Sequence, residues 1–166
     1  MTTTDLTPQQ LGGNWLLKAE ADYDSAPSGT DYTAYAKAVM VCAKGDGEIS
    51  TPERDWILGF FAALGATPEL LRELRDYQAD DSFESLVATT EAVAASTRAL
   101  PYYALRACSA DGELHPGEIA SIRAMNALRG FPDDLVDSWL ALHEEEQRLR
   151  TRRLALIWPD PSAKPY

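Results

Sequence analysis

The sequence has little positive charge. Its 166 residues include 15 lysines and arginines against 26 aspartates and glutamates, so the formal net charge is −11 at pH 7. Proteins that bind nucleic acids draw much of their affinity from lysine and arginine contacts with phosphates. This excess of acidic residues therefore argues against a nucleic-acid partner and favours cations or basic proteins.

Long apolar segments are missing as well. The longest apolar run, from Ile57 to Ala66, is interrupted by Gly59 and is far shorter than the ~20 residues of a transmembrane helix. The first ten residues, MTTTDLTPQQ, contain neither a basic start nor an apolar stretch, so no secretory signal is evident. We therefore expect no transmembrane segment and a cytoplasmic location.

Cysteine is scarce. Cys42 and Cys108 lie at corresponding places of a repeat described below, each in an apolar segment just before an acidic loop. Buried, reduced cysteines are much more common than disulfides in the cytoplasm, so we expect two free thiols. No CxxC motif or Cys/His spacing suggests a zinc site.

Recognisable catalytic motifs are also absent. The chain contains no nucleophile elbow, phosphate-binding glycine loop or HExxH motif, and no catalytic residue is predicted. No strand-like alternation of polar and apolar residues occurs either, which argues against a sheet.

Helical periodicity is what the sequence does contain. Apolar residues recur at spacings of three and four, and Pro, Gly, Asp or Ser bound the periodic segments. These patterns predict an all-α protein, a compact bundle of about seven helices over residues 31–155, between an N-terminal arm (1–30) and a Pro-rich tail (156–166). The expected helices are 11–21 in the arm, then 31–45, 51–64, 68–78, 82–95, 101–109, 116–128 and 132–154.

Two segments of the chain repeat each other. A shift of 65 positions lays the octapeptide DGEISTPE, which begins at Asp46, over DGELHPGE, which begins at Asp111, with four identities. An apolar segment precedes each copy and an amphipathic one follows. The repeat predicts two pseudo-symmetric helix–loop–helix units.

Each loop has an interpretation that needs no ligand. Gly47 and Gly112 stand where the chain turns sharply, and Ile49 and Leu114 are the single apolar residues that anchor the loops to the core. The last glutamate of the octapeptide closes a capping box with the residue three places before it, Ser50 in the first loop. His115 fits that role less well in the second loop.

The same loops also suggest a cation site. Carboxylates recur at matching offsets in both copies, and a tight turn followed by a helix-borne carboxylate gathers the oxygens that a hard cation binds. The candidate ions are calcium, magnesium and manganese, and the candidate ligands are Asp46, Glu48, Glu53, Asp111, Glu113 and Glu118.

A working EF-hand is not expected here. The glycine, aliphatic and glutamate positions match the second half of an EF-hand loop. However, its first and third ligand positions would be occupied by Cys42 and Lys44 in one copy, and by Ala107 and Ser109 in the other. These side chains supply almost no hard oxygen ligands.

The doubled motif resembles the TerB-like (tellurite-resistance) family. The resemblance rests on an apolar helix ending in Ala/Cys-x-x-Asp-Gly-Glu-(Ile/Leu)-x-x-x-Glu, followed by an amphipathic helix, and it covers about residues 32 to 130. It implies a compact all-α fold with internal pseudo-symmetry, a stress-linked setting, and a proposed metal-binding or partner-binding role for the acidic residues named above. The arm and the tail have no counterpart in it.

Three other segments have two interpretations each. Tyr102, Tyr103 and their aromatic neighbours are interpreted as core rather than as a ligand cavity. His143, which precedes three glutamates, is interpreted as part of a solvated helix face. The basic and apolar stretch 149–158 is expected to pack back onto the bundle, with a membrane or a partner helix as the alternative.

The leading hypothesis is a non-enzymatic domain that binds a divalent cation or a basic protein partner through its paired acidic loops. One alternative is a protein-interaction adaptor whose acidic loops serve only as helix caps. A second alternative is a small helical enzyme that uses the acidic clusters and His115 for acid–base chemistry.

Overall fold

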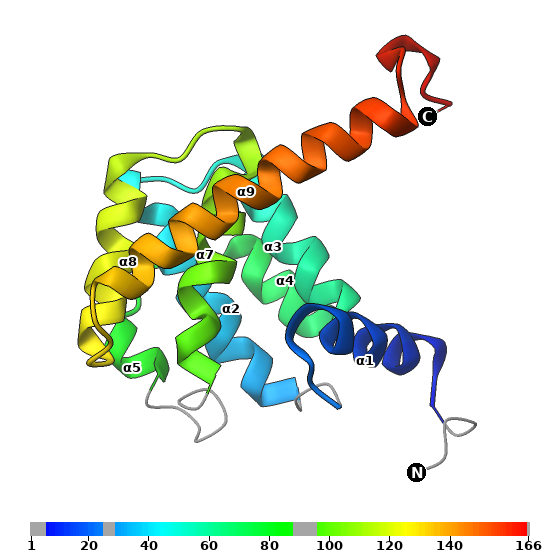
Figure 1. Ribbon diagram of the computed structural model, residues 1–166. Coiled ribbons are helices and arrows are strands. Elements are labelled where there is room, and N and C mark those ends of the chain that lie inside the picture. The colour runs from blue at the N-terminus through cyan, green and yellow to red at the C-terminus, as the bar shows by residue number, and fades with distance from the viewer. Residues whose placement is uncertain (1–5, 25–28, 88–95, 166) are drawn as a thin grey trace.

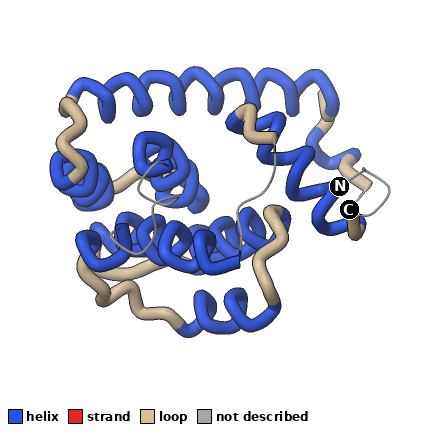
Figure 2. Tube along the Cα trace, turned by 90° about the horizontal axis from the view of Figure 1, so that it is seen from below, coloured by secondary structure: helices blue, strands red, loops and turns tan. Residues whose placement is uncertain are grey.

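The protein is an all-helical bundle, as predicted (Figure 1). The computed structural model describes residues 6–24, 29–87 and 96–165, and these contain helices and loops with no strand (Figure 2). No helix among them is both long and apolar enough to cross a membrane. The α-helices are α1 (Pro8–Ala21), α2 (Gly29–Ala43), α3 (Thr51–Ala63), α4 (Pro68–Asp76), α5 (Phe83–Val87), α7 (Leu100–Cys108), α8 (Pro116–Leu128) and α9 (Asp134–Ile157).

The centre of the bundle is formed by α2 and α7. These helices contact each other closely, and α3, α5, α8 and α9 surround them. Small side chains allow the close approach, because Ala36 and Ala38 of α2 and Ala104 and Ala107 of α7 are fully buried. The predicted core aromatics lie in the same region, where the Tyr103 ring packs at 6.2 Å from that of Tyr35.

The two predicted repeats are α2–α3 and α7–α8. Each pair is joined by a 3₁₀ turn, η2 (Lys44–Asp46) in the first and η4 (Ser109–Asp111) in the second. The 3₁₀ turns pack across the repeats, η2 against α8 and η4 against α3. The equivalent residues Ile57 and Ile122 are both fully buried, so the sequence shift corresponds to a structural pseudo-symmetry.

The N-terminal segment carries a helix that packs on the bundle. Helix α1 starts three residues earlier than expected, because Thr7 and Gln10 form a capping box at its first turn. The side chain of Gln9 donates a hydrogen bond to the carbonyl of Ala62 at 2.8 Å. Gly13 lies against the backbone at Leu64, where a Cβ would come within 2.9 Å of the carbonyl oxygen.

The packing of helix α9 differs from expectation in both halves of the helix. Its first half packs on α7 and α8 through Val136 and the buried His143, so the solvated interpretation of His143 is wrong. His143 lies two helical turns after Val136 and therefore shares its inward face. The second half projects beyond the bundle (Figure 1) and leaves Leu149, Leu156 and Ile157 exposed, so the expected packing of this stretch onto the bundle is also wrong.

The structure describes only the first part of the helix expected over residues 82–95, and it also describes most of the tail. Helix α5 accounts for the start of the expected helix, and residues 88–95 lie outside the described part of the chain. In the Pro-rich tail, Asp160 caps a short 3₁₀ helix, Pro161–Ala163, by accepting a hydrogen bond from the backbone of Ser162 at 2.9 Å.

Gly45 lies in close contact with the other repeat, and this contact generates the first prediction. A Cβ there would lie 2.6 Å from both the Cα of Glu118 and the carbonyl oxygen of Gly117. We expect Gly45→Ala to lower the free energy of unfolding by about 1–3 kcal/mol, the usual cost of overpacking. Urea unfolding measures the change.

Gly59→Ala is the matched control. Nothing lies within 4 Å of a Cβ at Gly59, which is in the middle of α3. This substitution should raise the stability by up to about 1 kcal/mol, because alanine is the better helix former. Equal effects of the two substitutions would contradict the close packing of the loop on α8.

Candidate metal centre between the two repeats

Glu53 and Glu118 are placed by matching helix starts. Each is the third residue of its helix, α3 or α8, and its Oε2 accepts a hydrogen bond from the backbone N–H three residues earlier, at Ser50 (2.6 Å) or His115 (2.7 Å). The capping interpretation of both glutamates is therefore correct. Each carboxylate also lies at the positive end of its helix dipole.

His115 is a better cap than its residue type suggested. Its Nδ1 accepts a hydrogen bond from the backbone N–H of Gly117 at 3.1 Å, and Glu118 completes a capping box. The imidazole replaces the serine hydroxyl because a neutral ring offers one acceptor nitrogen. This explains why the second loop needs no serine.

The two glutamates meet at the contact between the repeats. Glu53 and Glu118 are each only 3% exposed. One ligand atom of each, together with the Cys108 sulfur, lies within 4.8 Å of the others. Among the described residues, none donates a hydrogen bond to Oε1 of Glu53. A buried carboxylate oxygen without a donor is a costly feature that a cation or a proton would relieve.

The pKa of Glu118 reflects this crowding. Burial is the largest of the causes that raise this pKa from 4.5 to about 8, and a hydrogen bond with the Glu53 side chain and the negative charges of Glu53 and Asp46 contribute to the same shift. Two carboxylates this close are poorly tolerated when both are ionised and unpaired, so one of them holds a proton near neutral pH when no cation is bound. A cation would replace that proton.

Cys108 was not predicted as part of the site. Burial and the charges of the neighbouring glutamates raise the pKa of its thiol. Cys42 was expected to occupy the place in the first repeat that Cys108 occupies in the second. The 65-residue shift instead pairs Cys42 with Ala107, so that expectation was wrong by one position. One position rotates a side chain by about 100° on a helix, and the Cys42 sulfur lies instead 3.4 Å from that of Met125. Both thiols are free and buried.

The other four predicted ligands lie further out. Asp46 and Asp111 are exposed and accept hydrogen bonds through Oδ1 from the backbone N–H groups of Glu48 (3.2 Å) and Glu113 (2.9 Å). These bonds stabilise the turns, in which the glycines that follow the aspartates have φ of 115° and 99°. Both Glu48 and Glu113 are exposed. The loops therefore bring Glu53 and Glu118 together and leave the remaining acids at the rim.

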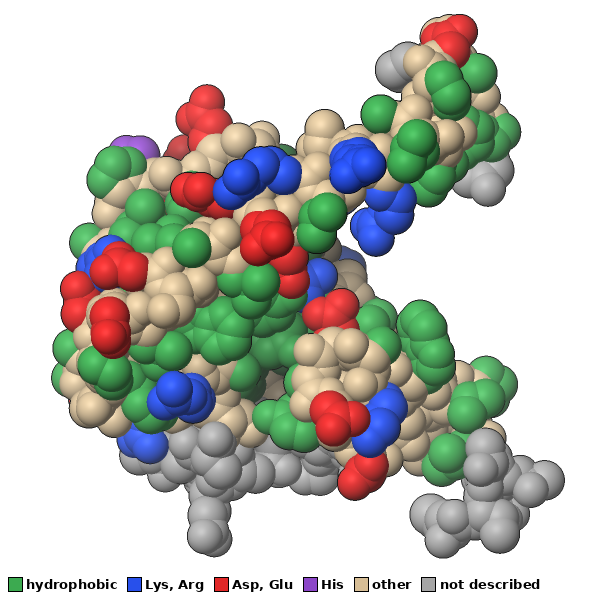
Figure 3. Space-filling view, viewed as in Figure 1, with side chains coloured by type: hydrophobic (Ala, Val, Ile, Leu, Met, Phe, Trp, Pro, Cys, Tyr) green, Lys and Arg blue, Asp and Glu red, His purple; other side chains and the backbone are tan. Residues whose placement is uncertain are grey.

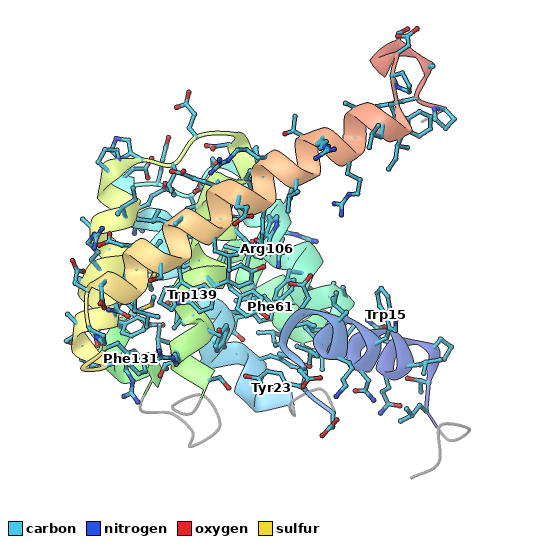
Figure 4. All side chains as sticks on the ribbon, viewed as in Figure 1. Trp15, Tyr23, Phe61, Arg106, Phe131 and Trp139 are labelled. Carbon is cyan, nitrogen blue, oxygen red and sulfur yellow. The ribbon has the colours of Figure 1, made fainter. Side chains whose placement is uncertain are left out.

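A separate cavity lies beside the second loop. Its volume is about 360 Å³, and its lining includes Trp56 and Arg106 but neither His115 nor the two buried glutamates. Arg106 lies under the middle of α9 (Figure 4), with its guanidinium 5.5 Å from the centre of the Trp56 ring and an ion pair to Glu20. An enzyme that used the acidic clusters and His115 for acid–base chemistry would need these residues in the wall of a substrate cavity. Neither the buried glutamates nor His115 lines this one.

The protein is thus an all-α domain of two similar repeats, in which equivalent glutamates of the two repeats are buried side by side. The structure superposes on the crystal structure of a tellurite resistance protein from Nostoc punctiforme PCC 73102 with a TM-score of 0.88 and 34% sequence identity, over 97% of this chain and 100% of that one. Neither protein-family profiles nor curated proteins match the sequence. The chain belongs to the TerB-like tellurite-resistance family.

The buried pair predicts a specific pH dependence of stability. The pKa of Glu118 is raised in the folded state, so the folded protein binds the proton more tightly than the unfolded chain does. This contribution is fully present below about pH 4.5 and is lost as the pH rises toward about 8. In a chelator, wild type should therefore lose stability relative to Glu118→Gln across this range, as followed by thermal unfolding in buffers of matched ionic strength. A constant difference would show that the carboxylate is not held in this environment.

Proposed function

We propose that the protein is a cytoplasmic, stress-linked TerB-like domain that binds one divalent cation between Glu53 and Glu118. The observation that carries the proposal is the buried Oε1 of Glu53, which has no hydrogen-bond donor in the described part of the chain, next to a second buried carboxylate. The related Nostoc protein is described as a tellurite resistance protein. We extend that setting, and not a particular ligand, to this chain.

The donor set supports a cation more than a purely structural role. The capping boxes use one oxygen of each carboxylate, Oε2, and Oε1 of Glu53 accepts no hydrogen bond from a described donor. Helix capping alone would be satisfied by an exposed glutamate. Burial of both carboxylates against each other is therefore unexplained by capping and is accounted for by a shared cation.

The ligand types also bear on which ion is bound. Calcium takes six to eight oxygens, and magnesium keeps several waters, so both are poorly served by a small, buried set of two carboxylates and a thiol. Manganese accepts carboxylates, and zinc accepts carboxylates together with a thiolate. We therefore favour manganese or zinc over calcium and magnesium, with Cys108 as a third ligand for zinc. A bound metal ion would deprotonate the thiol.

The exposed acids are assigned a secondary role. Asp46 lies close enough for its charge to influence Glu118, and the loop tips carry Glu48 and Glu113 at the surface. These groups would raise the local concentration of cations or of a basic partner without binding the ion directly.

Thermal unfolding of the metal-stripped protein tests the proposal. A cation that binds only the folded state at about 100 times its Kd adds about 2.7 kcal/mol of stability, which corresponds to a Tm rise of roughly 5–10 °C for a chain of this size. We expect such a rise with manganese or zinc, and its loss in Glu53→Gln/Glu118→Gln. Glutamine keeps the caps because it also serves in a capping box.

Glu48→Gln/Glu113→Gln is the matched control, with the same change of charge at the exposed loop tips. It should retain most of the response. Cys108→Ser should weaken the response to zinc much more than that to manganese. No response to any ion in wild type, or an equal loss in both double variants, would rule out the buried site.

A further inference from the structure

Helix α9 carries an unpartnered apolar stripe that continues into its projecting second half. Leu142, Leu149 and Leu156 follow one another at seven-residue intervals, which places them on one side of the helix. They are 39%, 57% and 75% exposed, respectively. Figure 3 shows this part of the molecule standing clear of the body, with apolar and basic side chains along it.

The stripe does not compete with the packing of α9 on the bundle. The side chains that face the bundle include Val136 and His143, which are buried. At about 100° per residue, Leu142 lies roughly a quarter-turn from His143, and Leu149 and Leu156 continue on that flank. The apolar stripe is therefore a lateral surface that remains open when α9 packs on α7 and α8.

Charges of opposite sign flank the stripe on either side of Leu149. Glu145 and Glu146 precede it, and Arg152 and Arg153 follow it at the same seven-residue spacing. Glu145, Arg152 and Arg153 form no ion pair with any described residue. Glu146 accepts a hydrogen bond from the Tyr102 hydroxyl at 3.0 Å.

We propose that this stripe binds a second copy of the chain, with the two α9 helices antiparallel and Leu149 on the twofold axis. Rotation about that axis places Leu142 opposite the partner's Leu156, and Glu145 and Glu146 opposite the partner's Arg152 and Arg153. Every leucine of the stripe then meets a leucine, and each of these four charges meets its opposite. An interface of this kind is isologous, as in most homodimers.

The charge pattern favours a second copy over other occupants. An anionic membrane would attract the arginines but repel Glu145 and Glu146, which border the same stripe. A parallel pair would place like charges side by side. Only the antiparallel register of identical helices satisfies both the glutamates and the arginines with this sequence.

Light scattering after size exclusion, over a dilution series of the full chain, tests for the dimer. Wild type should run as a dimer that dissociates on dilution, whereas Leu149→Glu should be monomeric at every concentration. Leu128→Glu is the matched control, since Leu128 is 51% exposed on α8, away from the stripe. A monomeric wild type at the highest concentration, with or without sedimentation on anionic vesicles, would overturn the proposal.

Cysteine crosslinking tests the register. The native Cys42 and Cys108 are buried, so an added surface cysteine is the reactive one. Leu149→Cys should form a disulfide-linked dimer under mild oxidation, because the two copies of this position meet at the axis. Leu156→Cys should not, since it faces position 142 of the partner. Equal crosslinking of both variants would indicate a parallel pair, and absence of crosslinking in both would exclude the pairing.

Discussion

The fold depends on the contact between each loop and the other repeat, which buries two carboxylates against each other. Loop η2 reaches α8 only because Gly45 has no side chain, and this approach leaves little room for water around Glu118. The helix dipoles and capping hydrogen bonds offset part of the cost of burying both charges. A proton or a cation must offset the rest of this cost by neutralising negative charge on the carboxylates. The packing of the bundle and the chemistry of its centre are therefore linked.

The pseudo-symmetry is incomplete, and its departures have structural consequences. The 65-residue shift pairs Gly45 with Ala110 and Gly117 with Pro52. On the glycine side the two backbones touch. On the other side Pro52 and Ala110 line the cavity that also contains Arg106. The contact between the repeats that Pro52 and Ala110 form therefore leaves open space, whereas the contact that Gly45 and Gly117 form closes over the carboxylates.

Much of the fold was predictable because it depends on local signals. Helical spacing, capping boxes and turn glycines are contained in short stretches, and the repeated octapeptide revealed both loops and both buried glutamates. The burial of His143 was missed because the three glutamates after it suggested a solvent-exposed helix face. Its spacing of seven and four residues from Val136 and Trp139 indicated instead that it shares their face, which packs on the bundle. The position of Cys108 beside the two glutamates was missed because an alignment of repeats does not show which side chains meet across them. The burial that separates Glu53 and Glu118 from the four outer acids likewise depends on tertiary contacts.

Anomalous diffraction from crystals grown with manganese tests the central claim most directly. The account predicts a single strong peak between the two repeats, within bonding distance of one oxygen from Glu53 and one from Glu118. A peak only at the exposed Glu48 or Glu113, or no peak at the buried pair at saturating manganese, would contradict it and leave the two buried glutamates as a structural, proton-sharing pair.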